Sequence, residues 1–216
     1  MAIAFLCLGA VGSTYSSGLA RNGATVKGYD IKFDTEGKEN FVNYQKCLDA
    51  GVQLVDSPKE LIEGSDIIIA VTSCSQAMET AAMYKPFLKK EQRYCEWNST
   101  VPDLVRKVEA FLGDNCTFVD CCTLCSPSMF GVATPCCSCG PAGEQTANEL
   151  NAYGMKIRYM GDSIGQASAF KVIRSIFTKS LEATLVESLA CARYYGVEED
   201  IFKSIVEFLT DEPTDE

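Results

Sequence analysis

The chain has 216 residues, 47% of them hydrophobic and 22% charged, with a formal net charge of −10 and a sequence pI of 4.6. A chain of this size can bury a real core, while its excess of acid excludes binding to nucleic acid through a general positive charge. The twelve cysteines are accompanied by no histidine, which excludes His-dependent nucleophilic catalysis and His-ligated metal sites.

The first thirty residues predict a strand, a glycine turn, a helix and a second strand. The segments are an apolar run at 2–8, the turn Gly9-Ala10-Val11-Gly12, a helix at 13–21 and a strand at 25–29 that ends at Asp30. A strand, turn, helix and strand that close on an acid form the βαβ unit of dinucleotide-binding proteins. The opening of the chain therefore predicts a nucleotide site.

Each part of this unit has a chemical task. Glycine lets the backbone come close to a pyrophosphate, and the first N–H groups of the helix face that anion. We expect Gly9-Ala10-Val11-Gly12 to bind the pyrophosphate and Asp30 to accept hydrogen bonds from a ribose of NAD, with NADP possible because Lys32 follows. The motif is incomplete because Cys7 replaces its first glycine, so an ordinary strand-to-helix turn is the alternative.

Strands and helices then alternate along the chain. Strands are predicted at 52–55, 66–71, 94–97, 118–124, 132–138 and 156–159, and helices at 40–50, 57–64, 76–83, 101–112 and 141–153. The stretches 31–40 and 126–131 are predicted to be loops. This alternation is typical of an α/β fold with a doubly wound, mostly parallel sheet of the Rossmann type.

Polar residues follow two of the predicted strands. Thr72 and Ser73 come after 66–71, and Asn98, Ser99 and Thr100 come after 94–97. Open α/β sheets bind ligands at the carboxyl ends of their strands. We therefore assign all five residues to the cofactor site.

The segment 165–195 reads as one long helix, followed by a last helix near 198–209. One face carries a continuous apolar stripe, formed by Phe170, Ile173, Phe177, Leu181, Leu185 and Leu189. The short segment after it cannot cover so long a stripe, so we predict a homodimer through this helix. The predicted domains are a Rossmann domain at 1–162 and a helical segment at 163–216.

Six cysteines lie between 121 and 139, as Cys121, Cys122, Cys125, Cys136, Cys137 and Cys139. Such a cluster could hold zinc or an iron–sulfur centre. Most of them fall in predicted buried strands, where cysteine acts as a small hydrophobic residue, and only one C-x-x-C pair is present. We expect no metal and free thiols in the cytoplasm, since no signal peptide or membrane span is evident either.

Four motifs in this order and spacing resemble the 6-phosphogluconate dehydrogenase-like, or β-hydroxyacid dehydrogenase, superfamily. They are Gly9-x-x-Gly12, Tyr29-Asp30, Asn98-Ser99-Thr100-x-Pro102 and Gly165-x-Ala167-x-x-x-Lys171. The nearest subgroup is one with an atypical C-terminal domain. The resemblance implies a Rossmann domain that binds NAD or NADP, and a helical domain that often completes the active site across a dimer. The present helical segment is shorter than that domain.

The resemblance also implies roles for residues on and near the long helix. Lys171 is then the catalytic group that acts on the hydroxyl of a hydroxyacid, with Ser175 at the position where the family has asparagine. Cys125 and Ser126 fall in the loop that holds the substrate carboxylate in the family. Arg174, one turn from Lys171, can help to bind that carboxylate and to lower the lysine pKa.

The sequence thus predicts an NAD(P)-dependent oxidoreductase that transfers hydride to or from a small hydroxyacid or related alcohol, with Lys171 handling the proton. Two other functions stay open. One is a nucleotide-binding protein without turnover, which the replaced glycine and the short helical segment would allow. The other is a metal-binding protein built on the cysteine cluster.

Overall fold

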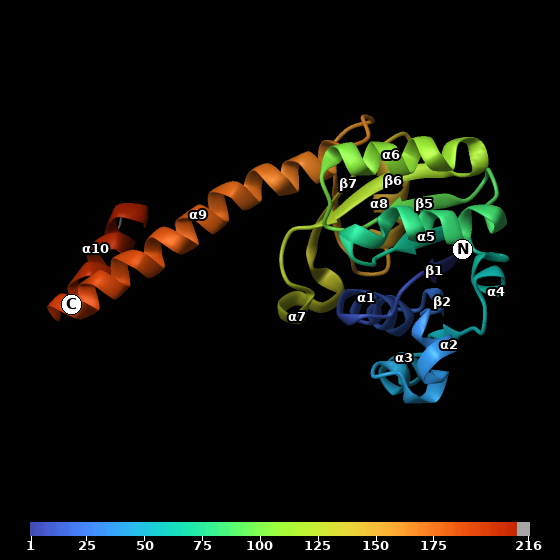
Figure 1. Ribbon diagram of the computed structural model, residues 1–216, viewed down its shortest axis with the longest axis horizontal. Helices are drawn as coiled ribbons and strands as arrows, with labels where there is room; N and C mark the ends of the chain where they lie inside the picture. Colours follow the sequence, from blue (N-terminus) through green and yellow to red (C-terminus); the bar gives the residue numbers. More distant parts are fainter. Residues whose placement is uncertain (211–216) are drawn as a thin grey trace. The chain divides into compact units, whose positions relative to one another are not determined.

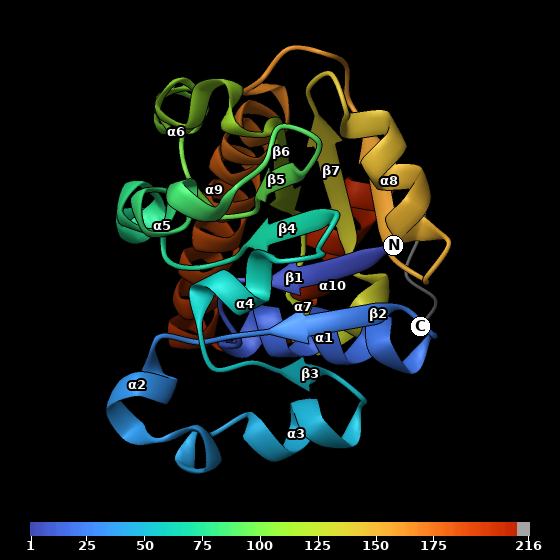
Figure 2. The same ribbon diagram turned by 90° about the vertical axis from the view of Figure 1, so that its right-hand side faces the viewer.

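Eight strands form one sheet in the computed structural model, which describes residues 1–210 (Figure 1). The strands are β1 (Ala2–Phe5), β2 (Thr25–Gly28), β3 (Gln53–Leu54), β4 (Ile67–Ala70), β5 (Arg93–Glu96), β6 (Thr117–Thr123), β7 (Pro135–Cys139) and β8 (Lys156–Tyr159). Their order is β3-β2-β1-β4-β5-β6-β7-β8, and Figure 2 shows the first four side by side. All neighbours are parallel except β6 and β7. The doubly wound, mostly parallel Rossmann-type sheet is confirmed.

The helices connect these strands in the alternating order that the sequence predicts. They are α1 (Ala10–Arg21), α2 (Lys32–Glu36), α3 (Tyr44–Asp49), α4 (Pro58–Ile62), α5 (Ala77–Tyr84), α6 (Pro102–Leu112), α7 (Pro127–Phe130), α8 (Gly143–Asn151), α9 (Gln166–Tyr195) and α10 (Glu198–Thr210). The centre of the sheet is the β-branched run of β4, whose four residues are all buried. A strand covered on both faces needs such a run, because neither face meets water.

Two predicted loops contain helical turns. The prediction of a loop at 31–40 is wrong, because this stretch contains α2 and a 3₁₀ turn at Lys38–Asn40. Its one aromatic side chain, Phe33, is buried, and the ring meets Tyr29 and Phe41 edge-on at centroid distances of 5.7 and 5.4 Å. The packing of this ring orders the polar segment around it. The segment has no periodic apolar pattern from which its helical turns could be predicted.

The second predicted loop, 126–131, contains α7. The strand predicted at 132–138 begins only at Pro135, since Gly131–Ala133 form a 3₁₀ turn. The first helix also begins earlier than predicted, at Ala10 rather than at Ser13, with Gly9 as its N-cap. The N-terminus of the helix, with its free N–H groups, therefore lies directly at the glycine turn.

Asp120, in the middle of β6, holds the start of α9. Its Oδ2 accepts hydrogen bonds from the Gly165 and Ser168 N–H groups, both at 3.1 Å, and its Oδ1 accepts one from Ser168 Oγ at 2.7 Å. The thiol of Cys139 donates to Oδ2 at 3.2 Å. Asp120 is fully buried, so this helix end supplies the donors and the positive dipole that a carboxylate inside the protein requires.

The described chain divides into two compact units, the first from Met1 to Lys171 and the second from Val172. The second unit contains the rest of α9 and α10, joined by a turn at Gly196. It leaves large apolar side chains exposed, including Ile176, Phe177 and Phe208. The domain division at residues 162 and 163 stays a prediction. In the part of the chain that the structure describes, we find no helix whose length and hydropathy suffice to cross a membrane.

Replacing Asp120 by alanine should lower the free energy of unfolding by about 3 kcal/mol, because it leaves the Gly165 and Ser168 donors buried without an acceptor. Urea denaturation measures this change. Asp103→Ala is the matched control, because that carboxylate is 82% exposed and pairs with Arg106 on the surface of α6, where a loss below about 0.5 kcal/mol is expected. Equal losses in the two variants would contradict the role given to Asp120.

Candidate functional site

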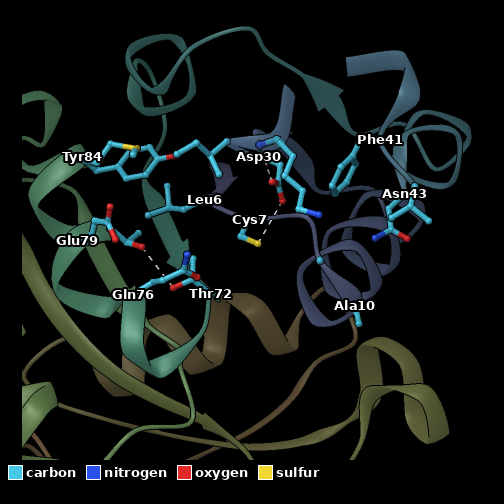
Figure 3. A pocket seen from close by; sticks show the side chains of 16 residues that line it. Leu6, Cys7, Ala10, Asp30, Phe41, Asn43, Thr72, Gln76, Glu79 and Tyr84 are labelled. Carbon is cyan, nitrogen blue, oxygen red and sulfur yellow. Dashed lines mark hydrogen bonds between the residues drawn. The ribbon is translucent and has the colours of Figure 1, made fainter. Parts of the chain in front are cut away.

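A cavity of about 450 Å³ opens beside the glycine turn, at the carboxyl ends of β1, β2 and β4 (Figure 3). The first strand and the turn contribute Leu6, Cys7, Gly9 and Ala10 to its wall. The other wall residues are Asp30, Ile31, Lys32, Phe41, Val42, Asn43, Thr72, Gln76, Glu79, Thr80, Met83 and Tyr84. Four residues assigned to the cofactor from the sequence thus line one cavity, namely Gly9, Ala10, Asp30 and Thr72.

The turn itself requires glycine at one position. A Cβ atom on Gly12 would lie 2.0 Å from the Cys7 carbonyl oxygen, so α1 can approach the end of β1 only without a side chain there. A Cβ on Gly9 would meet only Cys7 Sγ, at an ordinary 3.7 Å. The first bond of α1 runs from Ser13 N–H to the Gly9 carbonyl at 2.9 Å, so the N–H groups of Ala10, Val11 and Gly12 form the open helix end.

Asp30 is held at the edge of the cavity by the backbone around it. Its Oδ2 accepts from Leu8 N–H at 2.9 Å and its Oδ1 accepts from Lys32 N–H at 3.1 Å. Oδ2 also accepts from the Cys7 thiol at 3.3 Å (Figure 3). Burial, followed by the nearby Asp30 charge, raises the pKa of Cys7 to about 11, so the thiol keeps its proton at neutral pH. The cysteine in place of the first glycine therefore acts as a donor to the carboxylate.

The turn after β5 carries buried polar groups without partners. Asn98 is 2% exposed, and neither its amide oxygen nor its amide nitrogen has a hydrogen-bond partner among the described residues. Glu96 is fully buried, with Oε1 accepting from Asn98 N–H at 3.2 Å and Oε2 also unpartnered in that part of the chain. Burial raises the pKa of Glu96 to about 7. Unpaired buried groups are rare in proteins and mark places where a ligand or water is expected.

Lys171 lies against this turn. Its Nζ donates a short hydrogen bond to Ser99 Oγ, and the side chain is half-buried. Burial lowers the pKa of Lys171, while the thiols of Cys122 and Cys136 act in the opposite direction. The lysine is thus placed near a hydroxyl at the carboxyl edge of the sheet, in an environment that favours its neutral form.

The remaining predicted residues lie in three places. Thr100 is buried in the turn after β5, while Ser73 is exposed and donates from Oγ to Gln76 at 2.8 Å. Cys125 and Ser126 lie in the loop after β6, and the Ser126 and Ser128 hydroxyls are 2.8 Å apart. Arg174 and Ser175 continue α9 beyond Lys171 and belong to the second unit.

The cysteines between 121 and 139 are packed rather than grouped around an ion. Five of the six are buried, Cys125 is half-buried, and all twelve cysteines of the chain are free thiols. Cys122, Cys137 and Cys139 form a small apolar cluster with Ala167 at the start of α9. Within residues 1–210, no group of three or more Cys, Asp or Glu is arranged to hold a metal ion.

Sequence reasoning missed the two buried acids, Glu96 and Asp120. Both stand opposite each other in the pairing of β5 with β6. Each is a charged residue inside a run predicted to be a buried strand, and charged residues are almost never fully buried unless they have a structural or chemical task. That contrast is the signal that could have identified them. The cavity residues Phe41 and Asn43 had no comparable signal, because α2 and α3 bring them to the turn.

Comparison with known proteins places the first part of the chain in a family. The model of the NAD binding domain of 6-phosphogluconate dehydrogenase matches residues 2–123. An uncharacterized 28.5 kDa protein of Methanothermus fervidus is 27% identical over 158 residues, which are 73% of this chain. The match covers 60% of that relative, so the chain spans less than two thirds of its length.

Solved structures resemble nearly the whole chain. A conserved hypothetical protein of Sinorhizobium meliloti 1021 is 28% identical with a TM-score of 0.80, covering 96% of this chain and 70% of that one. The 3-hydroxyisobutyrate dehydrogenase of Mycobacterium tuberculosis superposes with a TM-score of 0.81 at 17% identity, covering 98% of this chain and 71% of that one. The second likeness concerns the fold alone.

Gly12→Ala should destabilise the protein by about 2 kcal/mol or more, because the new Cβ meets a backbone oxygen that cannot move aside. Gly9→Ala is the matched control and should melt close to the wild-type temperature. Thermal denaturation followed by circular dichroism compares the two variants. A normal melting temperature for Gly12→Ala would show that the turn tolerates a side chain there.

Glu96→Gln should change how stability depends on pH. The folded pKa of about 7 lies above the usual 4.5, so the folded protein keeps a proton that the unfolded chain releases, and stability falls as pH rises from about 4.5 to 7. The fall amounts to about 3 kcal/mol, and glutamine should abolish it and stabilise the protein at pH 8. Urea denaturation at pH 5, 6, 7 and 8 measures this, with the exposed Glu63→Gln as the control that should keep the wild-type slope.

Proposed function

The chain belongs to the family of the NAD binding domain of 6-phosphogluconate dehydrogenase, and we propose on this premise that it is an NAD(P)-dependent oxidoreductase. In this proposal it transfers hydride between the nicotinamide cofactor and a small hydroxyacid or related alcohol. The observation that carries the proposal is Lys171, a half-buried amine with a lowered pKa, bonded to Ser99 in the turn after β5. A lysine in such surroundings can exchange a proton with a substrate hydroxyl.

The residues present fit a dinucleotide. Gly12 lets α1 pack directly against the end of β1, and the open end of α1 presents N–H groups to an anion. Asp30 keeps acceptor capacity at the cavity edge, since a carboxylate offers about four lone pairs and the described residues supply three donors, the Cys7 thiol and the Leu8 and Lys32 N–H groups. In the proposal Gly9-Ala10-Val11-Gly12 binds the pyrophosphate, Asp30 a ribose, and Thr72 and Ser73 the neighbouring part of the cofactor.

The turn after β5 is proposed to bind the reactive half of the cofactor. The unpartnered Asn98 amide supplies both a donor and an acceptor, and Ser99 and Thr100 add hydroxyls. When bound, the nicotinamide supplies the hydride chemistry. The chain's own residues bind and orient the reactants and carry the proton at Lys171 Nζ.

Proton transfer at Lys171 depends on its protonation state. Burial favours the neutral amine, which can accept the hydroxyl proton as the alcohol is oxidised, and the ammonium returns that proton in the reverse reaction. Ser99 accepts a hydrogen bond from Nζ and so orients it. Ser175 is proposed as a second catalytic residue on α9, and Cys125, Ser126 and Arg174 as substrate-binding residues.

Lys171→Met should reduce turnover by roughly two to four orders of magnitude, because it removes the proton acceptor and keeps a side chain of similar length. The assay screens small hydroxyacids with NAD⁺ and NADP⁺, and Trp97 fluorescence measures cofactor binding separately. Ser99→Ala is the second variant, with a smaller loss expected. Wild-type turnover in Lys171→Met would refute the lysine assignment, and the absence of binding of either cofactor would refute the whole function.

We also propose a homodimer that works in the cytoplasm. The second unit exposes Ile176, Phe177 and Phe208, and apolar side chains in such number favour a protein partner. Twelve free thiols are typical of a reducing compartment. Light scattering at micromolar concentration should give twice the chain mass, and Phe177→Glu should shift the protein toward the monomer. A wild-type monomer under these conditions would contradict the dimer.

A further inference from the structure

Lys46, on the short helix α3, lies beside the helix end that faces the cavity. Its Nζ donates to Ser13 Oγ at 3.1 Å and to Thr14 Oγ1 at 3.0 Å. Both hydroxyls stand in the opening turns of α1, just beyond the N-cap Gly9. An exposed lysine would more often extend into water, so its position on the hydroxyls of another helix calls for an explanation.

This placement brings an ammonium group to the N-terminal part of a helix. The N-terminus of a helix carries about half a positive charge, and an ammonium group nearby is repelled by it. The first turn of α1 contains no acidic residue that would offset this charge. A bound anion removes the conflict, because it attracts the ammonium and the helix end together.

The same helix is already tied to the turn without the lysine. Asn43, just before α3, donates from Nδ2 to the Leu8 carbonyl at 2.8 Å, and Asn43 lines the cavity together with Gly9 and Ala10. Ser17 Oγ also donates to the Lys46 carbonyl at 3.5 Å, a contact that any residue at 46 could make. Holding α3 against α1 therefore does not require an ammonium group.

We propose that Lys46 is a further cofactor-binding residue, whose ammonium group pairs with the pyrophosphate at the start of α1. This inference rests on the proposed function and extends it to a residue outside the βαβ unit. Thr14 Oγ1 donates to the Ala10 carbonyl at 2.8 Å, so the hydroxyl that accepts from Lys46 is itself anchored at the helix end. From this position the flexible lysine side chain needs to move by no more than about one helical turn to reach the open N–H groups.

The assignment explains how an acidic protein can bind an anionic cofactor. The chain carries a net charge of −10, which disfavours the approach of a pyrophosphate. Lys32, a lysine that lines the cavity, pairs with Glu36 at 3.3 Å. The Lys46 ammonium group bonds to two hydroxyls, which are uncharged, so its full charge is available to an anion.

The test compares Lys46→Met, Lys46→Arg and Lys59→Met in the full chain. Lys59→Met is the matched control, because it removes the same charge from an exposed position on α4, away from the cavity. Calorimetry measures the affinity for NADH, NADPH, ADP-ribose and adenosine at two salt concentrations. Thermal melting of each variant separates loss of binding from loss of folding.

Lys46→Met should lower the affinity for NADH and for ADP-ribose about tenfold and make both affinities less dependent on salt concentration. The affinity for adenosine should stay unchanged, because adenosine has no phosphate. Lys46→Arg should restore most of the affinity, and Lys59→Met should behave as wild type. Unchanged ADP-ribose affinity in Lys46→Met would overturn the assignment. A loss of affinity confined to NADPH would also overturn the assignment, because it would indicate that the lysine binds the ribose 2′-phosphate. A wild-type protein that binds neither NADH nor ADP-ribose would overturn the proposed function as well.

Discussion

The carboxylate of Asp120 is the constraint on which the rest of the arrangement depends. It lies fully buried in the sheet and is satisfied almost entirely by the first residues of α9 and by the Cys139 thiol. A buried charge without such donors would cost several kcal/mol, so the start of α9 must sit where these bonds form. Lys171 follows one turn later on the same helix. The position of the proposed catalytic amine is thus a consequence of how one acid is neutralised.

The carboxyl edge of the sheet combines two kinds of polar group. Around the glycine turn, Asp30 is well supplied with donors and is held in a fixed orientation. Around the turn after β5, Glu96 and Asn98 keep buried atoms without partners among the described residues. The first kind stabilises the fold, whereas the second lowers stability in the absence of a ligand. Binding groups that are left unsatisfied in this way are what a site for a polar molecule needs.

The sequence predicted those features that depend on neighbouring residues. The alternation of apolar runs with helical segments gave the sheet, and the spacing from Gly9 to Asp30 gave the βαβ unit, because both patterns are local. The helical turns at 31–40 were missed since Phe33 is ordered by Tyr29 and Phe41, which a periodicity analysis does not connect. The late start of β7 was missed for a similar reason, as a 3₁₀ turn precedes Pro135.

By itself, then, the sequence determined the fold class, the nucleotide-binding family and the absence of imidazole chemistry, since each follows from composition or from short-range pattern. Only the tertiary structure decided that Cys7 donates to Asp30, that Asp120 anchors α9, and that Lys46 stands at the end of α1. These contacts join residues 23, 48 and 33 positions apart. Such pairs meet because strands and helices pack in three dimensions, and no spacing along the chain encodes that meeting.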